Sequence, residues 1–143
     1  MASSRPLQGP DPLRNVFDVL ILGAGPAGLS AALSLGRVMR SVVVFDSHQY
    51  RNEASDHVHT LPLHDDENPA VVRANMKQEI VKKYRTITFT ETAAMTVKEE
   101  AGVFEVMDQS EKLWKGRKLI LTTGCHDILP DIPGFKQGWG KTM

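Results

Sequence analysis

The feature that most constrains this chain is a glycine-rich turn that joins an apolar run to an alanine-rich segment. Residues 17–22 read FDVLIL, the short continuous apolar pattern of a parallel strand buried on both faces. The turn that follows reads GAGPAG over residues 23–28, and Pro26 stands where the first turn of a helix tolerates a missing N–H. The small and aliphatic residues that continue from there predict a helix to about Met39.

A second strand and an acidic residue complete the unit. Residues 41–45 read SVVVF, a β-branched run, and Asp46 follows directly. Strand, glycine turn, helix and strand in this order predict a βαβ crossover. In a G-x-G-x-x-G turn, Gly23 allows the tight bend, Gly25 lets a pyrophosphate approach the backbone, and Gly28 lets the helix pack closely on the strand.

This arrangement predicts a dinucleotide site. A phosphate at a helix N-terminus meets free N–H donors and the positive end of the helix dipole. Asp46, at the end of the second strand, can accept from both hydroxyls of a ribose and would repel a 2′-phosphate. The alternative is a turn that only packs helix on sheet, which would leave the helix N–H groups and Asp46 without an evident partner.

The rest of the chain predicts a longer loop, a second helix and several strands. Residues 50–69 are polar and lack periodicity, which indicates an irregular loop. Asn68 and Pro69 look like the cap and first turn of a helix to about Tyr84. Its predicted apolar stripe consists of Val71, Val72, Met76, Ile80, Val81 and Tyr84. Strands are predicted over residues 86–90, 94–98, 103–107 and 118–122, with turns at 100–102 and 115–116, and no regular structure is predicted near Pro130, Pro133 and Gly134. The fold class is therefore α/β: a Rossmann-type domain with a parallel sheet, a crossover helix and a small antiparallel β layer.

Composition excludes several classes of function. The 143 residues, 41% hydrophobic and 24% charged, suit one globular domain. Basic and acidic residues balance at 17 each, so no net field favours nucleic acid or a membrane surface, and the longest apolar run is too short to span a bilayer. The only cysteine, Cys125, excludes an internal disulfide, and residues 1–15 lack the apolar stretch of a signal peptide. We expect a cytoplasmic protein with a disordered leader over residues 1–15 and one domain over residues 16–143.

Several segments together resemble a known family. They read FDVLILGAGPAGLSAALSLGR, VVVFDSHQYRN, HVHTL, and GRKLILTTGCHDILPDIPGF followed by WG. In combination they are similar to the thioredoxin-reductase-like flavoenzymes of fungal natural-product pathways, the group that includes the gliotoxin-type dithiol oxidases. The likeness covers about residues 16–140. It implies a class-II pyridine nucleotide-disulfide oxidoreductase, an FAD-dependent enzyme that oxidises a small thiol or a related centre in secondary metabolism.

The resemblance also implies which residues contact FAD. It gives no catalytic residue and no metal ligand within this chain. For Ala94 it implies a backbone contact to adenine, which the residue type alone does not suggest. The positions that match the family's FAD contacts are Gly23, Ala24, Gly25, Pro26, Ala27, Gly28, Asp46, Gln49, Arg51, Asn52, His59, Ala94, Thr123 and Gly124.

The sequence also departs from the family pattern. In the family a C-x-x-C pair follows the W-G segment, and an NADPH domain and a return segment complete the flavin site. None of these is present in the sequence, so we expect a truncated chain in which no internal flavin-to-dithiol relay can operate. The alternative function is a non-catalytic flavin-binding module, or a subunit that needs a homodimer or another partner.

Other candidate residues receive structural interpretations. The ligand types in His57, His59, His64, Asp65 and Asp66 do not have the spacing that fixes a tetrahedral metal set, so a loop over the flavin is favoured. Cys125 is interpreted as a small packed hydrophobe rather than a nucleophile. Trp114 and Trp139 are interpreted as surface coverage rather than as a stacking platform.

Overall fold

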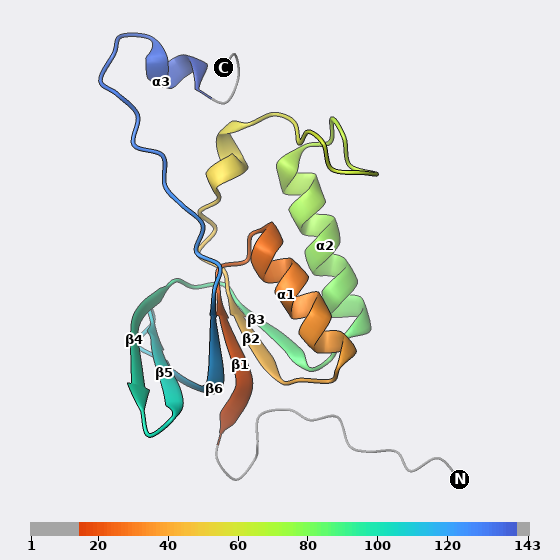
Figure 1. Ribbon diagram of the computed structural model, residues 1–143, viewed down its shortest axis with the longest axis vertical. Coiled ribbons are helices and arrows are strands. Elements are labelled where there is room, and N and C mark those ends of the chain that lie inside the picture. The colour runs from red at the N-terminus through yellow and green to blue at the C-terminus, as the bar shows by residue number, and fades with distance from the viewer. Residues whose placement is uncertain (1–14, 140–143) are drawn as a thin grey trace.

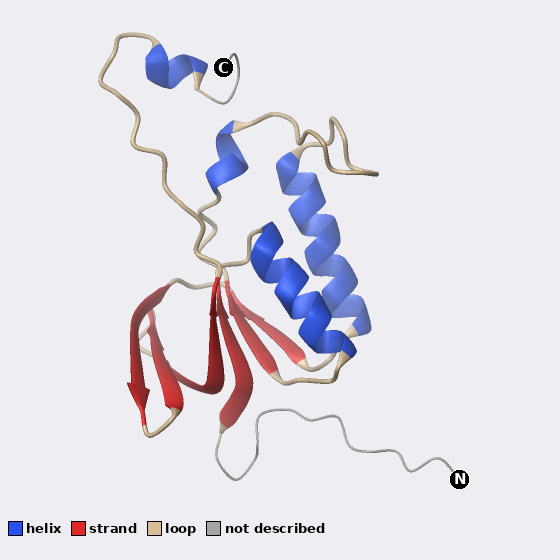
Figure 2. Cartoon of the chain, viewed as in Figure 1, coloured by secondary structure: helices blue, strands red, loops and turns tan. Residues whose placement is uncertain are grey.

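The computed structural model describes residues 15–139, so nearly all of the predicted leader lies outside the described part of the chain. The secondary-structure elements alternate between strands and helices in the first half and are mainly strands in the second (Figures 1 and 2). In chain order they are β1 (Val16–Leu22), α1 (Pro26–Arg37), β2 (Val42–Phe45), the 3-10 turn η1 (Arg51–Ala54), α2 (Pro69–Lys83), β3 (Ile87–Thr90), β4 (Ala94–Glu100), β5 (Val103–Asp108), β6 (Leu113–Leu121) and α3 (Phe135–Gly138).

One six-stranded sheet has the order β3-β2-β1-β6-β5-β4. Strands β3, β2, β1 and β6 run parallel, whereas β5 and β4 are antiparallel. Strand β6 belongs to both parts, because its first half pairs with β5 and most of its length pairs with β1. The βαβ unit and the mixed sheet agree with the predicted fold class.

The turn predicted at residues 115–116 is wrong, because Gly116 lies inside β6. It pairs with Phe17 of β1 on one side and Phe104 of β5 on the other. A Cβ on Gly116 would stand 2.5 Å from Cγ of Leu20, so this glycine serves the close approach of a side chain rather than a bend. The reversal between β5 and β6 lies instead at residues 109–112, where Glu111 has a φ of +63°.

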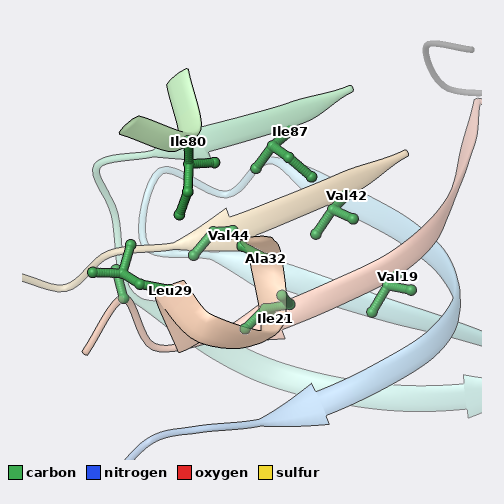
Figure 3. Close-up of a cluster of buried hydrophobic side chains, with 9 residues drawn as sticks. Val19, Ile21, Leu29, Ala32, Val42, Val44, Ile80 and Ile87 are labelled. Carbon is green, nitrogen blue, oxygen red and sulfur yellow. The ribbon is translucent and has the colours of Figure 1, made fainter. Parts of the chain in front are cut away.

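Helices α1 and α2 cover one face of the parallel strands (Figure 1). Figure 3 shows Leu29 and Ala32 of α1 and Ile80 of α2 turned toward Ile21 and Val44 of the sheet. Asn68 caps α2 as predicted, because its side chain accepts from the N–H of Ala70 at 2.9 Å. The predicted stripe of α2 is too wide: Val72 and Ile80 are buried, whereas Val71 and Val81 are 46% and 57% exposed.

Side chains of the antiparallel strands β4, β5 and β6 pack against the face of the parallel strands that the helices leave uncovered. Val106 of β5 is fully buried against Phe17 and Phe45, and the ring of Trp114 lies 6.0 Å and 5.8 Å from the ring centroids of these two phenylalanines. The predicted antiparallel layer is therefore present. The interpretation of Trp114 as surface coverage is wrong, because its indole packs, partly buried, against Phe17 and Phe45 from two neighbouring strands of the parallel part of the sheet.

Two short helical turns fall where the sequence predicts none. The η1 turn lies within the predicted loop over residues 50–69, and α3 follows Pro133. Gly134 precedes α3 as its N-cap residue with a φ of +83°, a conformation that glycine adopts freely, so a proline-rich stretch can still lead into one helical turn. Figure 1 shows the segment after β6 reaching away from the sheet before α3. Within residues 15–139, no helix has the length and apolar character that a membrane span requires.

Candidate dinucleotide site

The carboxyl ends of the parallel strands lie in register along one edge of the sheet. Leu22 pairs with Phe45 and with Leu121, and Phe45 pairs with Thr90. The residues that come next therefore lie along the same edge, and backbone hydrogen bonds of 2.9–3.0 Å from the N–H groups of Asp46, Gly23 and Thr122 extend the ladder beyond β2, β1 and β6. These next residues are, in order across the sheet, Glu91, Asp46, Gly23 and Thr122. This edge is where open α/β sheets bind ligands.

The three glycines of the turn differ in what surrounds them. A side chain on Gly23, whose φ is +111°, would overlap the backbone carbonyl of Thr122. A Cβ on Gly28 would overlap the carbonyl oxygen of Gly23 and stand 2.8 Å from Oγ1 of Thr122. A Cβ on Gly25 would meet no atom within 4 Å. The first and third glycines are therefore required by packing, whereas the second faces open space that a ligand can enter.

That open space lies at the N-terminus of α1. Gly25 is the N-cap residue, no side chain caps this helix, and Pro26 has no N–H to donate. The N–H groups of Ala27 and Gly28 belong to the first helical turn, where the helix itself offers no acceptor. Ala24, within the turn, is buried in the hydrophobic core, and this burial anchors the turn to the domain. The uncapped helix end and the gap at Gly25 fit the pyrophosphate of a dinucleotide.

Thr122 holds this turn in place, although it was not among the predicted site residues. Its Oγ1 lies 2.9 Å from the carbonyl oxygens of both Leu22 and Gly23. The hydroxyl therefore donates to the backbone at the point where β1 ends and the turn begins. The predicted contacts Thr123 and Gly124 follow it and are exposed. A hydroxyl residue at the end of the strand beside β1 is the signal that could have indicated this role.

Asp46 is the buried acid of this edge. It is 2% exposed, and its Oδ1 accepts from the N–H of His48 at 3.0 Å and from the hydroxyl of Tyr50 at 2.7 Å. Its Oδ2 lies 3.4 Å from Nζ of Lys77 on α2. Burial acts to raise the pKa of Asp46, but the hydrogen bonds from Tyr50 and His48 and the nearby positive charges outweigh it, so the pKa is lowered. Asp46 is therefore held as a carboxylate.

Two side chains of α2 complete the surroundings of Asp46. The guanidinium of Arg73 lies 3.9 Å from the ring centroid of Tyr50 and donates to Oδ1 of Asn52 at 2.6 Å. The ammonium of Lys77 donates to Oε1 of Glu91 at 2.7 Å. Burial acts to lower the pKa of Lys77, and its contacts with Glu91 and Asp46 reverse that effect and raise it. Of the residues that surround Asp46 here, Asn52 was predicted to contact the cofactor, whereas Tyr50, Arg73 and Lys77 were not.

Among residues 15–139, one group of possible metal ligands is found, and it lies at the same edge. Asp46, His48 and Glu91 each offer one ligand atom, and these atoms lie within 4.8 Å of one another. Lys77 contacts both carboxylates of this group, so an ammonium already supplies the positive charge there. The contacts within this group therefore resemble an ion-pair network.

The remaining predicted residues are spread over three segments. Arg51 forms a two-pronged ion pair with Asp127, at 3.0 Å from Nε and 3.0 Å from Nη2, which ties η1 to the segment after β6. Gln49 is exposed beside Asp46 in the chain. His59 lies in the loop before α2, where its Nδ1 is 3.4 Å from a carboxylate oxygen of Asp66.

Ala94 begins β4 and packs, partly buried, against the core cluster that contains Phe45. Cys125 is exposed, so the expectation that it packs in the interior is wrong. It directly follows Gly124, whose φ of +68° turns the chain away from the sheet. The structure thus gathers the glycine turn, Asp46 and Asn52 around one edge, while Gln49, His59 and Gly124 lie on exposed segments.

The fold and this edge define the class of the protein as a Rossmann-type dinucleotide-binding domain. Its sequence matches the model of the pyridine nucleotide-disulphide oxidoreductase family over residues 17–143. The chain belongs to this family.

Comparison with known proteins supports the assignment and gives the extent of the match. The chain is 44% identical over 129 residues to thioredoxin reductase sirT of Leptosphaeria maculans, which covers 89% of this chain and 39% of that protein. It is also 44% identical over 131 residues to thioredoxin reductase tcpT of Claviceps purpurea, with coverage of 90% and 41%. The chain therefore spans about two fifths of the length of these relatives.

A solved structure shows the same arrangement. The crystal structure of an oxidoreductase from Agrobacterium tumefaciens superposes with a TM-score of 0.84 at 34% identity, covering 88% of this chain and 42% of that one. The expected family and fold class are confirmed. The individual contact residues remain predictions, because these comparisons concern whole domains.

Proposed function

We propose that this chain forms the FAD-binding part of an FAD-dependent oxidoreductase of the thioredoxin-reductase type. One observation carries the proposal: the gap at Gly25 and the ionised Asp46 lie on the same edge of the sheet, as a dinucleotide's pyrophosphate and ribose require. The names of the relatives, thioredoxin reductases from fungi, support the redox assignment. FAD, when bound, supplies the electron-transfer chemistry.

The residues of this chain bind and orient the cofactor. The N–H groups of the first turn of α1 donate to the pyrophosphate, and Gly25 leaves room for it because it carries no side chain. The Asp46 carboxylate accepts from the ribose. Thr122 keeps the turn at a fixed distance from β6, so the phosphate and ribose positions are fixed relative to each other.

The proposed substrate is a small thiol, a disulfide or a related oxidisable centre of a fungal natural-product pathway. The 143 residues contain one cysteine, so they do not themselves supply a dithiol pair. The thiol that exchanges electrons with the flavin is therefore provided by the substrate or by protein outside this sequence. Oxygen or a partner is the proposed electron acceptor.

One experiment tests the proposal. The purified chain is separated from unbound small molecules, and its visible absorbance shows whether it retains flavin. The absorbance is then recorded again after addition of NADPH or a dithiol. Retained flavin that is bleached by a dithiol supports an oxidoreductase. Flavin that is retained but bleached by neither reagent indicates the non-catalytic module, and a chain that takes up no FAD refutes the cofactor assignment.

A further inference from the structure

The hydroxyl of Tyr50 already occupies one oxygen of the proposed ribose acceptor. It lies 2.7 Å from Oδ1 of Asp46, and the N–H of His48 lies 3.0 Å from the same atom. A carboxylate oxygen accepts about two hydrogen bonds along its lone pairs, so Oδ1 is saturated within the protein. A ribose hydroxyl can therefore reach Asp46 only through Oδ2, unless Tyr50 moves.

Oδ2 has a weaker partner. Nζ of Lys77 lies 3.4 Å from it, whereas the same ammonium lies 2.7 Å from Oε1 of Glu91. The shorter contact is the stronger one. Lys77 can lose its contact with Asp46 and still retain its ion pair with Glu91. A ligand can therefore replace the contact at Oδ2 more easily than the two hydrogen bonds at Oδ1.

The ring of Tyr50, in contrast, is held in place by Arg73 of α2. The Arg73 guanidinium covers the Tyr50 ring at 3.9 Å, and its Nη1 donates to Oδ1 of Asn52 at 2.6 Å. Arg73 is itself only 9% exposed and comes from α2, the helix that packs on the sheet. The ring is thus fixed between the end of β2 and a helix, and its hydroxyl keeps the Asp46 carboxylate in one orientation.

We propose that Tyr50 is a positioning residue for the ribose of the dinucleotide: it fixes the Asp46 carboxylate with Oδ2 toward the ligand, and Lys77 is the contact that the ribose replaces. The inference rests on the proposed function and deepens it, since it assigns one carboxylate oxygen to the ligand and the other to the protein. Tyr50→Phe and Lys77→Met should therefore change affinity in opposite directions.

The test is an equilibrium titration of the flavin-free chain with FAD. Tyr50→Phe keeps the ring under Arg73 but removes the hydroxyl, and we expect about tenfold weaker binding. Lys77→Met removes the competing contact, and we expect about threefold tighter binding. Tyr84→Phe is the matched control, because Tyr84 packs against Gly36 at the far end of α1, and its affinity should equal that of the wild type.

A second readout separates positioning from general damage. The groups that face Asp46 are His48, Tyr50 and Lys77 directly, with Glu91 and Arg73 behind them. Loss of the Tyr50 hydroxyl should raise the pKa of Asp46, which carboxyl-carbon NMR of the flavin-free chain measures without any ligand. The pH at which FAD affinity is half lost should rise with it, and Tyr84→Phe should leave both values unchanged.

The outcomes distinguish the inference from the proposed function. Wild-type affinity and an unchanged Asp46 pKa in Tyr50→Phe would overturn the inference while the wild-type chain still binds FAD. Weaker binding by Lys77→Met, as large as that of Tyr50→Phe, would also overturn it. A wild-type chain that takes up no FAD refutes the proposed function itself, and with it the ribose role of Tyr50.

Discussion

The carbonyl oxygen of Gly23 occupies the space in which a Cβ on Gly28 would lie. The turn and the first turn of α1 are therefore in contact through backbone alone. The side chain of Thr122 also borders this space, since its Oγ1 would stand 2.8 Å from that Cβ. Gly28 is thus a packing requirement of the fold, whereas Gly25, three residues earlier in the same motif, has open space beside it.

Gly28→Ala should destabilise the domain. The added methyl forces the carbonyl of Gly23 or the Thr122 hydroxyl to move, and overpacking of this kind costs about 1–3 kcal/mol. Urea unfolding followed by circular dichroism measures the change. Gly25→Ala is the matched control, since its methyl meets no atom within 4 Å, and equal midpoints for the two variants would contradict the packing role of Gly28.

Gly25→Val should abolish flavin retention in a chain that remains folded. The φ of Gly25 is −70°, which any residue adopts, so the side chain causes no backbone strain and instead fills the proposed pyrophosphate position. Flavin absorbance after gel filtration, together with the circular dichroism spectrum, gives both quantities. Stoichiometric flavin in Gly25→Val would refute the assignment of the phosphate turn.

Asp46→Ala should weaken FAD binding by about 1.5–3 kcal/mol, the range for hydrogen bonds to a charged group. Asp46→Asn should weaken it less, because its amide oxygen can still accept from Tyr50 and from the N–H of His48. Titration of the flavin-free variants with FAD compares them. An Asp46→Ala variant with wild-type affinity would remove the ribose role of this residue.

The stability of the fold at acidic pH should depend on the ionisation of Asp46. Its pKa in the folded chain lies below the value of 3.8 that it has when unfolded, so the ionised form stabilises the fold in full above pH 3.8. This contribution declines as the pH falls through the lower, folded pKa. The difference in urea midpoint between wild type and Asp46→Asn should therefore be constant near pH 7 and shrink below about pH 3.8. A difference that stays the same down to pH 2.5 would show that Asp46 ionisation does not stabilise the fold.

Trp114→Ala should destabilise the domain by about 2–4 kcal/mol, because the indole fills the space between Phe17 and Phe45. Trp114→Phe should cost less, since it keeps an aromatic ring and loses the 2.8 Å hydrogen bond from Nε1 to Oδ2 of Asp108. Denaturant unfolding orders the three proteins. If Trp114→Ala unfolds at the wild-type midpoint, the antiparallel strands do not stabilise the sheet through this ring.

The βαβ unit could be predicted from sequence because each of its signals is local. The apolar run, the glycine spacing and the acid after the second strand all lie within residues 17–46, and each has one dominant physical explanation. Gly116 could not be interpreted in the same way. A glycine flanked by polar residues indicates a turn locally, and its actual reason is the side chain of Leu20, which lies far away in sequence.

The unpredicted residues of the candidate site likewise depend on partners that are distant in sequence. Arg73 and Lys77 lie on a helix whose pattern indicates only an amphipathic surface, and their partners Tyr50 and Glu91 lie on other segments. Their role depends on how α2 lies across the end of β2, which tertiary packing decides. Asp46 was found because its place at the end of a strand carries the chemistry by itself.

The central position of β6 sets the order in which this domain can assemble. The hydrogen bond from Thr122 to the carbonyl of Leu22 spans 100 residues, and β1 has β6 as its neighbour on one side. On a ribosome, β1 can pair with β2 early, but its other edge stays unpaired until residues 115–121 of β6 have been made. Such non-local pairing slows folding and leaves an apolar strand edge open to other chains in the meantime. Early binding of a chaperone to the segment around β1 would therefore protect this domain more than binding to its antiparallel strands, which meet their neighbours almost as soon as they are synthesised.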